Sequence, residues 1–142
     1  NNFNPNDFYR FTVQSQGDRR SIDIINDGQN NKLTLARTSH VSSQRWKLRS
    51  LGNNYYRLTT EWQGEDKSLD VVNDGILDHK LSLAPTGQYS GQMWKITPVG
   101  NGFYRLTTQW KGYKRSLSFF SNSVVLANTK CSNEQFWKIT RA

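Results

Sequence analysis

The sequence has 142 residues, with 19 Lys and Arg against 11 Asp and Glu, a formal net charge of +8 and a pI near 9.8. This length suits a single domain over residues 1–142, or small repeats that share one core. No apolar run approaches the roughly 18–20 residues of a membrane span, and the single cysteine, Cys131, excludes an internal disulfide and a cysteine-based zinc cluster. With two histidines and no HExxH pattern, we expect no metal and no cofactor.

Four short strings recur three times along the chain, in the same order and at nearly the same spacing. From the N-terminus of each repeat they are Tyr9–Thr12, Tyr56–Thr59 and Tyr104–Thr107; Ser21–Ile24, Ser68–Val71 and Ser116–Phe119; Leu33–Ala36, Leu81–Ala84 and Val124–Ala127; and Gln-x-Trp-Lys at 44–47, 92–95 and 135–138. The chain therefore divides into repeats of about 8–52, 53–100 and 101–142. The third repeat lacks five residues where the others carry Asn26-Asp27-Gly28 and Asn73-Asp74-Gly75.

Each repeat has the pattern of β-structure. The strings alternate apolar and polar residues with period 2, and no stretch of 11 residues keeps a helical apolar stripe. The Asn-Asp-Gly triplets are typical of turns between strands. We therefore expect an all-β fold of about twelve short strands. Because three units are too few for a propeller, the repeats favour a closed threefold barrel with a hairpin cap, which is a β-trefoil.

Three Gln-x-Trp motifs in three repeats of about 45 residues resemble the ricin-type (ricin B-like) lectin domain, from about residue 8 to residue 140. The resemblance implies a β-trefoil with pseudo-threefold symmetry that binds glycans or polysaccharides without catalysis and is secreted. Our leading hypothesis is that the domain has up to two weak sites, which act by avidity through an attached domain or an oligomer. Trp46, Trp94 and Trp137 are then expected in the core.

In this family an aspartate on the second strand accepts hydrogen bonds from sugar hydroxyls, a ring stacks on the sugar, and the motif glutamine steadies the aspartate. By resemblance, these roles fall to Asp23 with Gln44 in the first repeat and to Asp70 with Gln92 in the second. The third repeat has Ser118 in place of the aspartate, so we expect its site to be lost.

Both candidate sites lack the family's stacking ring, because Ala36 and Ala84 stand there. Tyr89 and His40, which precede the second and first motifs, are the candidate replacements. The turn residues that follow each aspartate could add polar contacts, or could serve backbone geometry alone; they are Asn26, Asp27, Asn73 and Asp74.

Two other functions stay open. Trp62 and Trp110 occupy matching positions before a glycine turn, where they either pack across a repeat boundary or offer an exposed platform for a protein partner, as in an inhibitor or a toxin's receptor-binding module. Residues 97–142 carry 7 basic groups and 1 acidic group, so Lys111, Lys114 and Arg115 could attract anionic glycans or another anionic polymer. We expect no sequence-specific nucleic-acid binding and no enzyme activity, because no recognition motif or catalytic constellation is present.

Overall fold

The alternating strings form the strands of the protein. The computed structural model describes residues 3–76 and 78–142, and within these ranges it has twelve strands and two short 3₁₀ helices. The strands are β1 (Tyr9–Val13), β2 (Arg20–Ile24), β3 (Leu33–Arg37), β4 (Trp46–Gly52), β5 (Tyr55–Thr60), β6 (Lys67–Val71), β7 (Leu81–Pro85), β8 (Trp94–Gly100), β9 (Phe103–Thr108), β10 (Arg115–Phe120), β11 (Ser123–Asn128) and β12 (Trp137–Arg141). The 3₁₀ helices, η1 (Ser42–Gln44) and η2 (Ser90–Gln92), end on the glutamine of the first two motifs.

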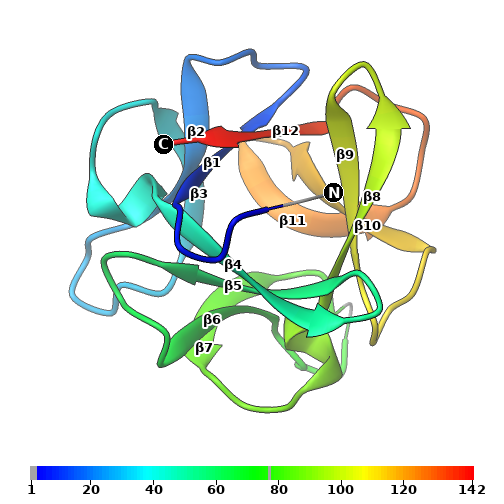
Figure 1. The fold of residues 1–142 in the computed structure, drawn as a ribbon. Coiled ribbons are helices and arrows are strands. Elements are labelled where there is room, and N and C mark those ends of the chain that lie inside the picture. The colour runs from blue at the N-terminus through cyan, green and yellow to red at the C-terminus, as the bar shows by residue number, and fades with distance from the viewer. Residues whose placement is uncertain (1–2, 77) are drawn as a thin grey trace.

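Six strands close a barrel in the order β1-β12-β9-β8-β5-β4, and all neighbours are antiparallel. The other six form three hairpins, β2-β3, β6-β7 and β10-β11. Figure 1 shows the three repeats around a common centre, the first in blue to cyan, the second in green and the third in yellow to red. The predicted β-trefoil of three repeats is confirmed.

The motif tryptophans lie in the core, as predicted. Trp46, Trp94 and Trp137 are at most 1 % exposed, and each indole Nε1 donates to a carbonyl oxygen of its own repeat's hairpin. The acceptors lie at 3.2, 3.0 and 2.9 Å and are the carbonyls of Ile22, Leu69 and Leu117. Each ring therefore fills the barrel and ties a hairpin to it, which explains why the sequence repeats this residue.

A second set of bonds also recurs in every repeat. The serine that opens the second string shares a 2.6 Å hydrogen bond with a threonine after the third string: Ser21–Thr38, Ser68–Thr86 and Ser116–Thr129. The arginine of the first string donates to a carbonyl in the segment before the motif: Arg10 to Ser39, Arg57 to Gly87 and Arg105 to Lys130. These bonds hold the segment that leads into each motif against the barrel.

The hairpin turns break the symmetry. In the third repeat, β10 and β11 are joined by two residues, Ser121 and Asn122, with φ of 50° and 62°, the geometry of a tight hairpin turn. The longer loops of the first two repeats instead reach a neighbouring hairpin, where Leu83 N donates to Asn31 O and Leu126 N to His79 O, both at 2.9 Å.

One end of the barrel is filled by a residue outside the repeats. The Phe3 ring makes edge-on contacts with Tyr9, Tyr56 and Tyr104, the tyrosines that open the first string of each repeat, at centroid distances of 5.5, 5.7 and 5.6 Å. The N-terminal segment, shown near the centre of Figure 1, thus runs to the barrel axis. Among the described residues, no helix is long and apolar enough to cross a membrane.

Candidate functional site

The second repeat contains an open pocket of about 540 Å³, which we call the Asp70 pocket. It lies at the end of β6, beside the segment that leads into η2. Its lining residues are Asp70, Val71, Val72, Asn73, Gln88, Tyr89, Ser90, Gly91 and Trp110.

Asp70 is half-buried on β6, and one of its carboxylate oxygens is held by the motif glutamine. Gln92 Nε2 donates to Asp70 Oδ2 at 3.1 Å and to the Pro85 carbonyl at 3.0 Å, while its Oε1 accepts from Gly87 N at 3.1 Å. Since Gln92 is fully buried and bonded at both ends, it positions Asp70 and does not line the pocket. Asp70 Oδ1 makes no hydrogen bond with any residue that the structure describes, so this oxygen is free to accept one from a ligand.

The freedom of this oxygen depends on Gly91. A Cβ atom built on Gly91 would lie 2.8 Å from Asp70 Oδ1, which is closer than real Cβ atoms approach other atoms. The same Cβ would also meet the Trp110 ring at 3.6 Å. A residue with a side chain at position 91 would therefore displace the carboxylate.

Two aromatic rings border the pocket. Tyr89 is 61 % exposed, and its ring lies directly over Gly87, whose missing side chain leaves the space that the ring occupies. Trp110 comes from the third repeat and is half-buried, with its backbone N–H donating to Ser90 O at 3.3 Å. Lys111 Nζ lies 4.1 Å from the centre of the Trp110 ring and covers part of it. The freely exposed ring of the pocket is therefore Tyr89.

The first repeat contains the same aspartate–glutamine pair, but the second carboxylate oxygen has a different environment. Gln44 Nε2 donates to Asp23 Oδ2 at 3.0 Å, but here Asp23 Oδ1 accepts from Ile24 N at 2.7 Å. The position of Gly91 is taken by Ser43, which has a Cβ atom. Both oxygens of Asp23 are thus already engaged by the protein, in contrast to Asp70.

The remaining candidates lie in different settings. His40 and Asn26 are exposed on the first repeat, and Asn73 is exposed where it lines the Asp70 pocket. Tyr89 and Asn73 are therefore brought together with Asp70. In the part of the chain that the structure describes, Asp23 is hydrogen-bonded to Ile24 and Gln44 and to neither His40 nor Asn26.

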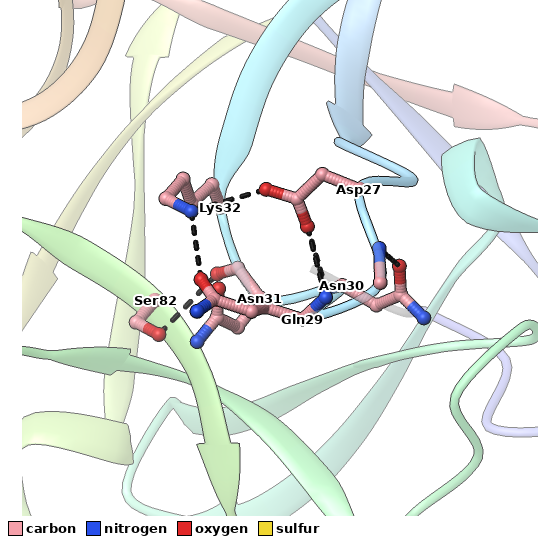
Figure 2. A network of polar contacts seen from close by, with 7 residues as sticks. Asp27, Gln29, Asn30, Asn31, Lys32 and Ser82 are labelled. Atoms are coloured by element: carbon pink, nitrogen blue, oxygen red, sulfur yellow. Dashed lines mark hydrogen bonds and ion pairs between the residues drawn. The ribbon is translucent and has the colours of Figure 1, made fainter.

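Asp27 organises its own loop, as Figure 2 shows. Its Oδ1 accepts from the backbone N–H groups of Gln29 and Asn30, and its Oδ2 pairs with Lys32 Nζ at 3.0 Å. The Asn30 N–H bond and the lysine lower the pKa of the Asp27 carboxyl below its ordinary value. The same loop contacts the second repeat where Ser82 Oγ donates to the Asn31 carbonyl.

Asp74 does the same in the second repeat. Its Oδ1 accepts from Ile76 N at 3.1 Å and from Asp78 N at 3.3 Å, and the Ile76 bond is the main reason that the pKa of Asp74 is lowered. The bonds of both aspartates are those of turn residues, which is the geometric alternative that the sequence left open.

The basic cluster of the third repeat is partly neutralised. Lys111 Nζ forms a 3.0 Å ion pair with Asp78 of the second repeat, with both side chains less than a quarter exposed. Lys114 is exposed and Arg115 is half-buried on β10. The three groups therefore do not present three free charges.

The sequence did not place Trp110 in the same pocket as Asp70. The two residues are 40 positions apart, and they line one pocket because the turn after β9 lies against η2 of the preceding repeat. Trp62 N donates to Ser42 O at 3.3 Å in the equivalent place of the first repeat. The matching positions of Trp62 and Trp110 in the sequence indicated a shared role, but only the assembled barrel shows which repeat each tryptophan borders.

No model of a known protein family matches the chain, and a search of curated proteins finds no similar sequence. Solved structures share its fold. ThreeFoil, a designed threefold-symmetric protein, is 22 % identical with a TM-score of 0.79, over 94 % of this chain and 97 % of that one. SeviL, solved with the asialo-GM1 saccharide, is 19 % identical with a TM-score of 0.71, over 96 % of this chain and 98 % of that one.

A third similar structure belongs to a larger enzyme. The endo-β-galactosidase from Clostridium perfringens that releases GlcNAcα1-4Gal is 16 % identical with a TM-score of 0.80, over 96 % of this chain but only 33 % of that one. At these identities the likeness establishes the fold alone. The protein is thus a β-trefoil, and its function has to be argued from its own pockets.

Proposed function

We propose that the protein binds carbohydrate without catalysis, and that the Asp70 pocket is its principal site. The observation that carries the proposal is the free carboxylate oxygen, Asp70 Oδ1, in an open pocket beside the exposed Tyr89 ring. A pyranose needs both groups, because its hydroxyls require fixed acceptors while its C–H face packs on an aromatic ring.

In this proposal Asp70 Oδ1 accepts hydrogen bonds from one or two sugar hydroxyls, and Tyr89 stacks on the sugar. Asn73, which is exposed at the rim, adds an amide that both donates and accepts. Asp23 binds more weakly or not at all, because Ile24 N–H already occupies the equivalent oxygen. A single shallow site binds weakly, so we expect avidity from an attached domain or an oligomer, and glycans outside the cell as targets.

Two of the similar structures suggest the first probes. One holds the asialo-GM1 saccharide, and another belongs to an enzyme that acts on a galactose-containing glycan. The asialo-GM1 saccharide and glycans that carry GlcNAcα1-4Gal therefore head the list, with other neutral glycans beside them.

The class of ligand is tested on a broad glycan array at about 0.15 M salt and again at roughly 0.5 M, since exposed charge attraction is strongly screened over that range. Selective binding to neutral glycans at both salt concentrations is the expected result. Binding to anionic glycans alone, lost at high salt, would favour an anionic-polymer binder on the third repeat, and a blank array would favour a protein partner.

The site is tested by a matched pair of substitutions. We expect Asp70→Asn to weaken binding roughly tenfold or more in calorimetry, because a hydrogen bond to a charged group contributes about this much. Asp23→Asn makes the same chemical change in the same motif and should lower affinity by less than about twofold on the same scale. Equal losses in the two variants would contradict the assignment to the second repeat.

A further inference from the structure

The third repeat has a pocket of its own at the place where the sequence predicts a lost site. It measures about 190 Å³, between the β10-β11 hairpin and the segment before β12. Its lining includes Ser118, Phe120, Lys130, Glu134 and Gln135. In the alignment of the repeats, Ser118 takes the place of Asp70, and Glu134 takes the place of Gly91.

In the third repeat the carboxylate of the pocket lies in the loop before β12, and not on the second strand of the repeat. Glu134 is the one acidic residue of residues 97–142, and it lies in this pocket beside the serine that replaced the aspartate. Its backbone is fixed, because Phe119 N donates to Glu134 O at 3.0 Å and Glu134 N donates to Ser132 Oγ at 3.2 Å. Its carboxylate forms no ion pair or hydrogen bond with any residue that the structure describes.

The motif glutamine is held differently here. Arg105 Nη1 donates to Gln135 Oε1 at 2.8 Å, and Gln135 Nε2 donates to the Asn128 carbonyl at 2.8 Å. The amide nitrogen carries two hydrogens, and in the other repeats the second one binds the aspartate. In the third repeat this hydrogen has no acceptor among the described residues, so the pocket has a donor where the Asp70 pocket has an acceptor.

An exposed ring completes the pocket. Phe120 is 59 % exposed at the end of β10, where the two-residue turn presents it at the pocket. Lys130 is exposed at the same pocket and makes no side-chain bond within the described residues. The pocket thus combines an apolar ring, a free carboxylate and two free donors, which are the groups that a hydroxylated ring requires.

We infer that the third repeat is a second carbohydrate site, which takes a single pyranose through Glu134, Gln135 and Phe120. The inference rests on the proposed function for the class of ligand, but uses none of the groups of the Asp70 pocket. Its smaller volume, about 190 against 540 Å³, fits one ring where the Asp70 pocket has room for more.

Because one protein holds both pockets, a single titration separates them. The ¹⁵N-labelled protein is titrated with a panel of methyl glycosides of galactose, glucose, mannose, fucose and N-acetylglucosamine, up to about 50 mM because single shallow sites bind in the millimolar range. Amides of Lys130, Ser132 and Glu134 report on the third repeat, and those of Asn73, Tyr89 and Gly91 report on the second.

We expect at least one glycoside to shift the third-repeat amides along a saturable curve of their own. Glu134→Gln should lower the affinity measured at the third-repeat amides roughly tenfold and leave the affinity measured at the second-repeat amides unchanged. Phe120→Ala should have the same selective effect, which guards against a misfolded Glu134 variant. Asp66→Asn, which neutralises an exposed carboxylate outside both pockets, is the control and should change neither curve.

The inference would be overturned if no glycoside shifts the third-repeat amides. It would also be overturned if these amides shift as much in Glu134→Gln as in the wild type. The proposed function fails separately. It is contradicted if no glycoside shifts the second-repeat amides, or if their shifts are the same in Asp70→Asn as in the wild type.

Discussion

At the scale of single residues, two aspartates in the same motif differ by one hydrogen bond. Asp23 Oδ1 accepts from Ile24 N, whereas the matching oxygen of Asp70 has no partner among the described residues. The neighbouring residue differs as well, because Ser43 carries a Cβ atom where Gly91 has none. We attribute the availability of Asp70 to this glycine.

Gly91→Ser should therefore close the second-repeat site. Its Cβ would lie 2.8 Å from Asp70 Oδ1, so the carboxylate must turn away. We expect glycan affinity to fall roughly tenfold in calorimetry, and unfolding free energy to change by less than about 1 kcal/mol, since no positive φ is required there. Ser43→Gly is the reciprocal control and should not weaken binding. Full affinity in Gly91→Ser would contradict this account of the glycine.

At the scale of elements, the hairpin loops explain the asymmetry of the molecule. In the first two repeats an aspartate accepts backbone N–H hydrogen bonds and holds a long loop. In the third repeat a two-residue turn takes the place of the loop. The aspartate-held loops and the two-residue turn each lead to a prediction about the free energy of unfolding.

The aspartate loops should weaken in acid. Hydrogen bonds from Asn30 N–H and Ile76 N–H lower the pKa of Asp27 and Asp74 below their unfolded values. Ionised carboxylates with lowered pKa contribute stability that is fully present above the unfolded pKa, near 4, and is lost as pH falls through the folded pKa. We therefore expect Asp27→Ala to be less stable than the wild type at pH 7 in urea unfolding, with the difference shrinking below about pH 4. A difference that grows in acid would contradict the assignment.

The two-residue turn should accept a better turn sequence. Ser121 has φ of 50° and Asn122 of 62°, and Asn-Gly is the preferred pair for this geometry. Replacing them by Ser121→Asn with Asn122→Gly should raise the free energy of unfolding in urea, because glycine has no Cβ atom to be strained at positive φ. Asn122→Val, a β-branched residue at positive φ, should lower it; equal stability of the two variants would show that the turn is not under this constraint.

At the scale of the whole molecule, Phe3 closes one end of the barrel. It contacts one tyrosine of each repeat, so it links all three through a residue that is not itself repeated. Phe3→Ala should lower the unfolding free energy by about 2–3 kcal/mol, since it removes three edge-on ring contacts and leaves a gap. Phe3→Leu should recover part of the loss. Because Phe3 lines neither pocket, glycan binding at low temperature should be unchanged.

The fold was predictable from the sequence because its strongest signals are local and occur three times. Period 2 within the strings and the repeated Trp46, Trp94 and Trp137 were sufficient for the strands and the core. The pockets were less predictable, because they depend on contacts between repeats and on space. Trp110 lines the Asp70 pocket from the neighbouring repeat. Glu134 lies in the loop before β12, so a search for a carboxylate at position 118 does not find it.

The central claim is that a sugar binds to Asp70 Oδ1 beside Tyr89. A crystal structure of the full chain with the neutral glycan that binds best on the array tests it most directly. We predict a sugar ring in the Asp70 pocket, with a hydroxyl within hydrogen-bond distance of Asp70 Oδ1 and its C–H face on Tyr89. A glycan bound elsewhere, with the Asp70 pocket empty, would contradict the account.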